Sequence, residues 1–202
     1  MEARASCLRQ VVLLTLWSKE KMEKIFLDAN EYLRNQWQLA AKIRSGGWRP
    51  DVIVGLWRGG ASVAVSVHEF LRSTGWDVEH YPLKCSSYTA IGLNDGEVVF
   101  SLADEFFSLL KKGSKVLFVD DVFDTGKTAV AVLERAKCCG ADAKIACVYF
   151  KSAKNTTEVK PDYFVIDPGS QWLVFPHEME GLSSQELFTK SPELASLVER
   201  CL

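Results

Sequence analysis

The sequence has no Cys-x-x-Cys pair, no apolar run long enough to cross a membrane and no excess of basic residues. Zinc sites and disulfide frameworks depend on suitably spaced cysteines, so the six cysteines are better explained as reduced thiols of a cytosolic protein. The formal net charge is -2, whereas proteins that bind nucleic-acid phosphates have a strongly basic surface. We therefore expect neither nucleic acid nor a membrane among the partners.

The apolar segment from Val11 to Trp17 is far shorter than the roughly 20 residues that span a bilayer. No small-residue cleavage site follows it, so we expect a strand here and a cytoplasmic location. Ser18 is expected to cap a long amphipathic helix that ends at Gly46 and Gly47. The glycosylation sequon Asn155-Thr156-Thr157 has little meaning in that compartment.

The chain has the length and apolar content of one α/β domain. With 202 residues and 48% hydrophobic side chains, it can bury roughly 70% of its unfolded surface without a metal or disulfide. Apolar β-type runs alternate with helical patterns, which predicts right-handed βαβ units and a mainly parallel central sheet flanked by helices. We expect strands at 51–56, 78–83, 116–119 and 144–150, and helices at 61–73, 102–111 and 127–140.

Two segments do not fit this alternation. Lys84 to Val99 is polar, contains two glycines and is long for a connection, so we expect it to be a lid over a site. Pro161 to Glu178 contains two short β runs around a Pro-Gly turn. We expect these runs to form a small antiparallel hood with the N-terminal strand, so that residues 11–17 and 161–180 make the hood of a single domain spanning residues 1–202.

The stretch KVLFVDDVFDTGKTA places three carboxylates, Asp120, Asp121 and Asp124, directly after a buried strand and before a helix that starts at Lys127. A Walker A loop would need glycine at position 121, and the segment Gly55–Gly60 does not match the dinucleotide pattern GxGxxG. One acid would suffice to cap the helix, whereas three so close together repel one another. In open α/β sheets ligands bind at this end of the strands, so the stretch predicts a binding site.

A sugar diphosphate matches the arrangement. Two of the acids can accept hydrogen bonds from ribose hydroxyls, while the N–H groups at the helix start can bind a phosphate. The pattern resembles the phosphoribosyl pyrophosphate (PRPP) loop of the type I phosphoribosyltransferases. The resemblance implies that the ribose phosphate is bound by Asp120, Asp121, Thr125, Gly126, Lys127 and Thr128.

The resemblance covers most of the chain. PDVIVGLWRGGASVAV is similar to the pyrophosphate loop of that family, which implies that Arg58 and Gly59 bind pyrophosphate and that the peptide Trp57-Arg58 is cis. The alternative is that Arg58 is a surface arginine. Ser87 and Tyr88 resemble the start of the catalytic loop.

The segments KSAK and QWLVFPHE resemble the branch that acts on the 6-oxopurines xanthine, guanine and hypoxanthine. By that likeness Lys151 donates to the 6-oxo group, Trp172 stacks on the purine, and Leu173 offers its backbone to the edge carrying the 2-substituent. Glu178 would bind Mg²⁺ together with Asp120 and Asp121. The alternatives are that Trp172 belongs to the core and that Glu178 is a surface acid. His177 stands where many xanthine-preferring relatives have an aromatic residue, so the base preference stays open.

The resemblance implies a Mg²⁺-dependent purine salvage enzyme that joins a base to PRPP and releases pyrophosphate. Asp124 would accept the purine proton, and a homodimer is expected, with Trp37, Trp48 and Trp76 as candidate interface anchors. A regulator that senses PRPP or nucleotides without turnover stays open, as does a transferase for another base. A diphosphokinase would have different residues around its acidic loop.

Overall fold

The computed structural model describes residues 24–87, 98–99 and 103–201. They divide into two compact units. The larger unit is Ala29–Ser170, and the smaller comprises the described parts of Met1–Asp28 and Gln171–Leu202.

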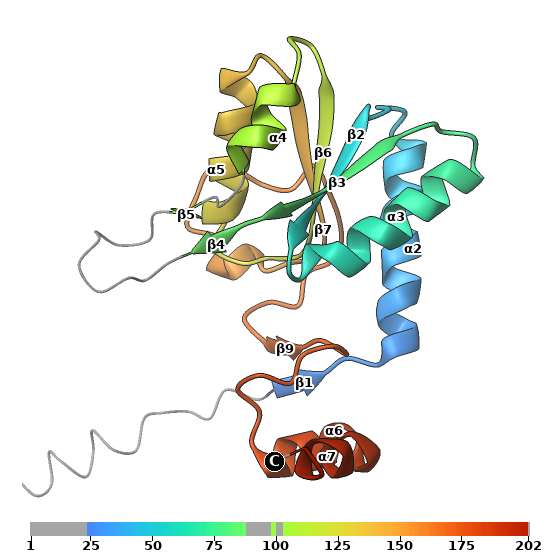
Figure 1. The fold of residues 1–202 in the computed structure, drawn as a ribbon, viewed down its shortest axis with the longest axis vertical. Helices are drawn as coiled ribbons and strands as arrows, with labels where there is room; N and C mark the ends of the chain where they lie inside the picture. Colours follow the sequence, from blue (N-terminus) through green and yellow to red (C-terminus); the bar gives the residue numbers. More distant parts are fainter. Residues whose placement is uncertain (1–23, 88–97, 100–102, 202) are drawn as a thin grey trace, which may run out of the picture. The chain divides into compact units, whose positions relative to one another are not determined.

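A parallel sheet of five strands forms the centre of the larger unit (Figure 1). Its strand order is β3-β2-β6-β7-β8, and every neighbouring pair is parallel, as the alternating pattern predicted. The strands are β2 (Val52–Trp57), β3 (Glu79–Lys84), β6 (Lys115–Phe123), β7 (Asp142–Phe150) and β8 (Tyr163–Ile166).

Helices cover both faces of this sheet, which confirms the predicted α/β class. In Figure 1, α2 and α3 lie on one side of the sheet, and α4 and α5 lie on the other. The helices are α2 (Ala29–Ser45), α3 (Gly60–Ser73), α4 (Ala103–Leu109) and α5 (Lys127–Cys138). The shorter elements are the antiparallel pair β4 (Ser86–Ser87) and β5 (Val98–Val99), and the 3-10 helix η1 (Ser152–Lys154).

The core between the sheet and helices α4 and α5 explains why the apolar runs form these elements. Phe118 of β6 is fully buried, and its ring packs against Phe107 of α4 with centroids 6.4 Å apart. Val132 of α5 is also fully buried in this cluster. Each such side chain contributes about 1.5 to 3 kcal/mol on leaving water. This burial holds β6, and therefore the acids at its end, in a fixed place.

The helix predicted to start after Ser18 begins later, at Ala29. Residues Lys24–Phe26 form strand β1 instead, and their parallel partner is β9 (Trp172–Val174). Leu27 continues this pairing by donating its N–H to the Val174 carbonyl at 3.0 Å. Pairing with a distant strand therefore overrides the local helical periodicity, which is a weak preference by comparison.

The predicted antiparallel hood is wrong in its strand direction, because β1 and β9 are parallel. The two strands are far apart in the chain, so no hairpin turn forces them to run in opposite directions. The first predicted β run of the hood, β8, pairs with β7 in the sheet of the larger unit. The predicted strand from Val11 to Trp17 lies outside the described residues.

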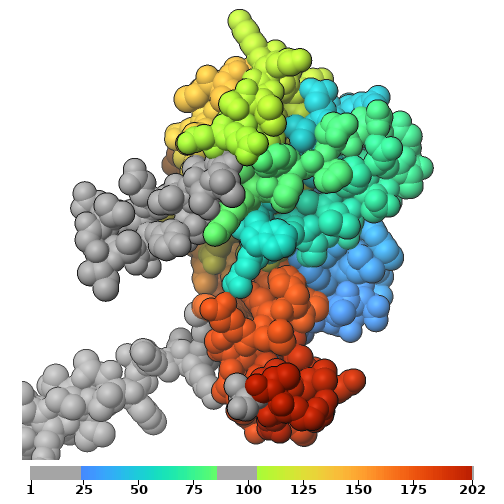
Figure 2. All heavy atoms as spheres, in the orientation of Figure 1, coloured from blue at the N-terminus to red at the C-terminus, as the bar shows by residue number. Residues whose placement is uncertain are grey.

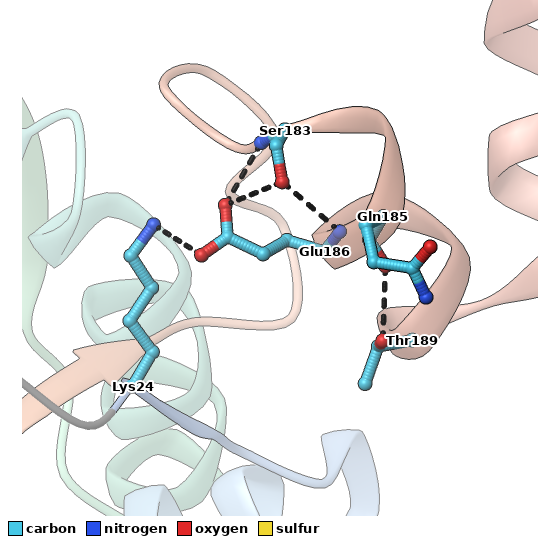
Figure 3. Close-up of polar contacts among 5 residues, drawn as sticks. All are labelled: Lys24, Ser183, Gln185, Glu186 and Thr189. Carbon is cyan, nitrogen blue, oxygen red and sulfur yellow. Dashed lines mark hydrogen bonds and ion pairs between the residues drawn. The ribbon is translucent and has the colours of Figure 1, made fainter. Parts of the chain in front are cut away.

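Two short helices, α6 (Ser184–Lys190) and α7 (Pro192–Glu199), complete the smaller unit. A capping box opens α6: Ser183 Oγ accepts from the Glu186 N–H, and Glu186 Oε2 accepts from the Ser183 N–H at 2.8 Å (Figure 3). The second carboxylate oxygen of Glu186 lies 2.9 Å from the Lys24 ammonium of β1. Lys24, and then the Ser183 donors, lower the pKa of Glu186 to about 2. One charged side chain thus joins α6 to β1.

The described helices contain no segment with both the length and the apolar character of a membrane span. Among the tryptophans predicted at an interface, Trp37 is exposed, whereas Trp76 is only 8% exposed. The Arg44 guanidinium lies 4.7 Å from the Trp76 ring. Trp76 is therefore not the exposed interface anchor that we expected, because its large apolar ring is packed into the larger unit.

Candidate active site

The acids Asp120 and Asp121 lie within β6, which continues to Phe123 rather than ending at Val119. Although the two residues are successive in the strand, their carboxyl groups interact, and Asp120 Oδ1 also accepts the Asp121 N–H at 3.0 Å. Asp121 is buried, and its Oδ1 accepts the Val122 N–H at 2.7 Å. Burial, and then the charge of Asp121, raise the pKa of Asp120. The end of β6 therefore holds an acidic pair suited to binding hydroxyl donors or a cation.

Two thiols lie near Asp120 in this part of the sheet. Burial, followed by the Asp120 charge, raises the pKa of Cys85 to about 12. The same two effects raise the pKa of Cys147, which has no exposed surface. Both thiols are therefore kept in the neutral form, which is a poor nucleophile and a poor metal ligand.

Gly59 and Gly60 follow β2 and approach β6 more closely than a residue with a side chain can. A Cβ on Gly59 would lie under 3.0 Å from the Asp121 carboxylate, and one on Gly60 would lie under 3.0 Å from the Val119 carbonyl oxygen. Real Cβ atoms essentially never show such separations. The segment after β2 thus lies directly against the acidic end of β6. The peptide Trp57-Arg58 is cis, as the resemblance implied.

The connection from β6 to α5 encloses a hollow of about 90 Å³. Gly126 has φ +84, a left-handed conformation that favours glycine, and α5 begins at the next residue. The first N–H groups of a helix have no carbonyl partner within it, and the helix dipole adds positive potential there. The hollow is lined by Asp120, Val122, Phe123, Asp124, Thr125, Gly126, Thr128, Ala129 and Ile145.

Lys151 lies beside this loop because β7 is the neighbour of β6. Its backbone N–H donates to the Phe123 carbonyl at 2.9 Å, and its Nζ donates to Asp124 Oδ2 at 3.4 Å. The Lys151 side chain is 7% exposed, whereas that of Asp124 is 41% exposed. Asp124 Oδ1 is buried and has no hydrogen-bond partner among the described residues. The fold therefore brings together the predicted base-reading lysine and the predicted proton acceptor.

The segment that follows Lys151 also contacts the loop, and this contact was not among the expectations from sequence. Thr156 donates both its N–H and its hydroxyl to the Thr125 carbonyl, each at 3.1 Å. The sequence contained one signal for this contact: Asn155-Thr156-Thr157 lies shortly after β7, and β7 is the neighbour of β6. Neighbouring parallel strands end at the same edge of a sheet, so their loops meet there.

The remaining predicted residues lie elsewhere. Trp172, which is 47% exposed, and the buried Leu173 belong to β9 of the smaller unit. Glu178 is also in the smaller unit, and its Oε2 accepts the Phe175 N–H at 2.9 Å. Ser87 lies in β4, and Tyr88 lies outside the described residues, as does most of the predicted lid.

A second hollow, of about 410 Å³, lies between α3 and the strands β2 and β3. Figure 2 shows α3, in aquamarine, beside the green atoms of β3. Most of the hollow's lining is apolar, although His68 and His80 meet there with ring centroids 4.8 Å apart. The acidic end of β6 does not line it.

Comparison with known proteins agrees with this geometry. Residues 24–182 match the phosphoribosyl transferase domain family. The bifunctional protein PyrR of Pasteurella multocida is 31% identical over 140 residues, which cover 64% of this chain and 74% of that protein. A hypoxanthine/guanine phosphoribosyltransferase of Methanococcus maripaludis is 35% identical over 71 residues, which cover 34% of this chain and 38% of that protein.

The solved structures include a similar purine phosphoribosyltransferase from Pyrococcus horikoshii. It is 32% identical with a TM-score of 0.62, and the match covers 80% of this chain and 99% of that one. The resemblance read from the acidic loop is thus confirmed. The chain belongs to the phosphoribosyl transferase domain family, and it is an enzyme of the phosphoribosyltransferase class.

Proposed function

We propose that the protein is a purine salvage enzyme that joins a 6-oxopurine to PRPP, giving the nucleoside monophosphate and pyrophosphate. The observation that carries this proposal is the position of Lys151, whose ammonium lies 3.4 Å from Asp124 beside the phosphate loop. A lysine can donate to a 6-oxo group, whereas it finds no acceptor in a 6-amino group. The similarity to the purine enzyme of Pyrococcus horikoshii supports the same substrate class.

In this proposal the ribose phosphate binds at the loop after β6. Asp120 and Asp121 accept hydrogen bonds from the ribose hydroxyls, and the backbone N–H groups at the start of α5 bind the 5′-phosphate. The residues assigned to the phosphate are Thr125, Gly126, Lys127 and Thr128. The pyrophosphate binds at Arg58 and Gly59, next to the same acids.

The purine roles are proposed separately for each unit. Lys151 of the larger unit donates to the 6-oxo group. Trp172 of the smaller unit stacks on the ring, a contact that contributes about 1 to 3 kcal/mol without selecting among purines. Leu173 offers its backbone to the edge carrying the 2-substituent. His177, whose ring stacks on Phe175 at 5.9 Å, marks a departure from the xanthine-preferring pattern.

Magnesium fits the donors at the end of β6, where burial and the neighbouring Asp121 raise the pKa of Asp120 and leave an acidic pair that a cation would stabilise. In the described part of the chain no three His, Cys, Asp or Glu side chains are grouped to hold a metal. Mg²⁺ prefers carboxylate oxygens and completes its shell with phosphate and water. We propose Asp120, Asp121 and Glu178 as its protein ligands. When bound, Mg²⁺ would neutralise charge on the diphosphate.

The residues of the chain then act as follows. As the bond from ribose C1 to pyrophosphate breaks, positive charge grows on the sugar, and the carboxylates of Asp120 and Asp121 stabilise it. A purine nitrogen forms the new bond to C1. Asp124 accepts the proton that this nitrogen loses, a role for which its buried Oδ1, without a partner among the described residues, is suited.

The test mixes protein, Mg²⁺ and PRPP with xanthine, guanine, hypoxanthine, adenine, uracil or orotate and measures pyrophosphate release. We expect release with one or more of the 6-oxopurines and little with the other bases. A melting-shift series with the corresponding nucleoside monophosphates ranks the bases, because a ligand that binds only the folded state stabilises it according to affinity. Release with uracil or adenine alone would contradict the assignment of Lys151.

The sequence also left open a PRPP- or nucleotide-sensing regulator without turnover. Binding of nucleotide in the melting series without pyrophosphate release from any base would support this alternative. We also propose a homodimer. Trp37, whose side chain is 46% exposed, is the candidate anchor of its interface. Sedimentation of the wild type and of Trp37→Ser tests that assembly.

A further inference from the structure

The loop that we assign to the 5′-phosphate is held by a segment of the chain that follows β7. We call residues 155–157 the bracing segment. Thr156 donates its N–H and its hydroxyl to the carbonyl oxygen of Thr125, at 3.1 Å each. Both lone pairs of that carbonyl are therefore used, so its direction is determined by Thr156.

The direction of this carbonyl also determines the direction of a donor. In a planar trans peptide the C=O and the following N–H point to opposite sides. Because the Thr125 carbonyl points at Thr156, the N–H of Gly126 points away from the bracing segment. A rotation of this peptide would instead present a carbonyl oxygen, which repels an anion.

Close packing at Gly126 keeps the loop and the bracing segment together. A Cβ on Gly126 would lie under 3.0 Å from both Asn155 Oδ1 and Thr157 Oγ1. Gly126 is buried and already adopts the left-handed conformation at φ +84. The loop therefore fits against the bracing segment only with glycine at this position.

The bracing segment is itself held by a network of hydrogen bonds. Asn155 Nδ2 donates to the Val159 carbonyl at 2.8 Å. Asn155 Oδ1 accepts from the N–H of Thr157 at 3.0 Å and from its hydroxyl at 2.9 Å. Asn155 thus uses both ends of its amide to keep the segment in the shape that Gly126 contacts.

We propose that Thr156 and Asn155 are positioning residues, which orient the phosphate loop so that its N–H groups face the 5′-phosphate of PRPP. This inference rests on the proposed function, because it assigns a support to the phosphate subsite of that site. The tripeptide Asn155-Thr156-Thr157, which matches a glycosylation sequon, thereby has a role in ligand binding.

The experiment measures two dissociation constants by calorimetry, that of ribose 5-phosphate and that of pyrophosphate with Mg²⁺. Thr156→Val removes the hydroxyl and keeps the shape, and Thr156→Ser restores the hydroxyl. A single hydrogen bond between uncharged groups changes an equilibrium by about twofold to tenfold. We expect Thr156→Val and Asn155→Ala to weaken ribose 5-phosphate binding by that factor. Pyrophosphate binding should be unchanged, and Thr156→Ser should match the wild type.

Glu158→Gln is the matched control, since Glu158 is exposed and lies in the same connection. It should leave both constants unchanged. The inference is overturned if Thr156→Val binds ribose 5-phosphate as the wild type does, or if both ligands weaken together, which would indicate a general loss of structure. If Asn155→Ala fails to fold, Thr156→Val alone decides. A wild-type protein that binds no ribose 5-phosphate would overturn the proposed function itself, and the inference with it.

Discussion

The ammonium of Lys151 donates to the carboxylate of Asp124 at 3.4 Å, although 27 positions separate the two residues in the chain. The lysine is 7% exposed and the aspartate 41% exposed, so the pair lies at the boundary between the protein interior and solvent. A charge in such a place interacts more strongly with its partner than two surface charges do. The two residues therefore should not be treated as independent in mutational tests.

Replacement of Asp124 tests its role in proton transfer. We expect Asp124→Asn to retain PRPP binding and to lower turnover by about 10² or more, because the amide cannot accept the purine proton. Single-turnover kinetics with a 6-oxopurine measures the effect. Glu134→Gln, an exposed change on α5, is the control. Turnover of the Asn variant near the wild-type rate would remove Asp124 from this role.

Replacement of Lys151 tests recognition of the base. We expect Lys151→Ala to raise the KM for 6-oxopurines by about tenfold or more, since a hydrogen bond from a charged donor contributes about 1.5 to 3 kcal/mol. The dissociation constant of PRPP should change little. Steady-state kinetics with the exposed Lys160→Ala as control checks both values. An unchanged KM for xanthine, guanine and hypoxanthine alike would show that Lys151 does not contact the base.

The two glycines after β2 should differ in their response to alanine. A Cβ on Gly60 would meet the Val119 backbone, which cannot move without displacing β6, so we expect Gly60→Ala to lower the free energy of unfolding by about 1 to 3 kcal/mol. A Cβ on Gly59 would meet the end of the Asp121 side chain, which can rotate. Gly59→Ala should therefore retain more stability while weakening PRPP binding. Urea unfolding and calorimetry on the two variants measure these effects, and equal losses of stability would contradict the distinction.

The contact between Glu186 and Lys24 should make the stability of the smaller unit depend on pH. The pKa of Glu186 is lowered to about 2 from its ordinary value of 4.5, so the native state binds its proton less readily than the unfolded state. This stabilisation is present above about pH 4.5 and is lost as the pH falls toward 2. Glu186→Gln keeps a side chain able to accept in the capping box and removes the charge.

We therefore expect Glu186→Gln to lower the melting temperature at pH 7 by about 1 °C, a small effect typical of an exposed pair. The difference from the wild type should shrink as the pH is lowered from 4.5 to 2. Thermal unfolding followed by circular dichroism over this range provides the measurement. Lys24→Met should show the same pH dependence. A difference that stays constant with pH would refute the assignment.

Sequence alone was sufficient for the parallel sheet, its helices and the succession of strand, acidic turn and helix from Lys115 to Cys138. The core strands are short apolar runs that are buried on both faces. Such a run can be identified as a strand from its own residues, whichever strands lie beside it. The acidic loop is also read locally, because Asp120, Asp121, Asp124 and the Thr-Gly-Lys-Thr that follows occupy consecutive parts of one strand, turn and helix. The cis peptide at Trp57-Arg58 came from the family resemblance of its surroundings.

Only the tertiary structure decided the direction of the β1 and β9 pair, the placement of β8 in the main sheet, and the burial of Trp76. Each of these features depends on contacts with residues far away in the chain. The sequence of a short apolar run does not indicate which strand it pairs with or whether the pair is parallel or antiparallel. The same holds for Thr156, whose two hydrogen bonds to Thr125 cross 31 positions of sequence. The local pattern of side chains determines whether a segment forms a helix or a strand. Which other elements that segment contacts depends on the tertiary packing.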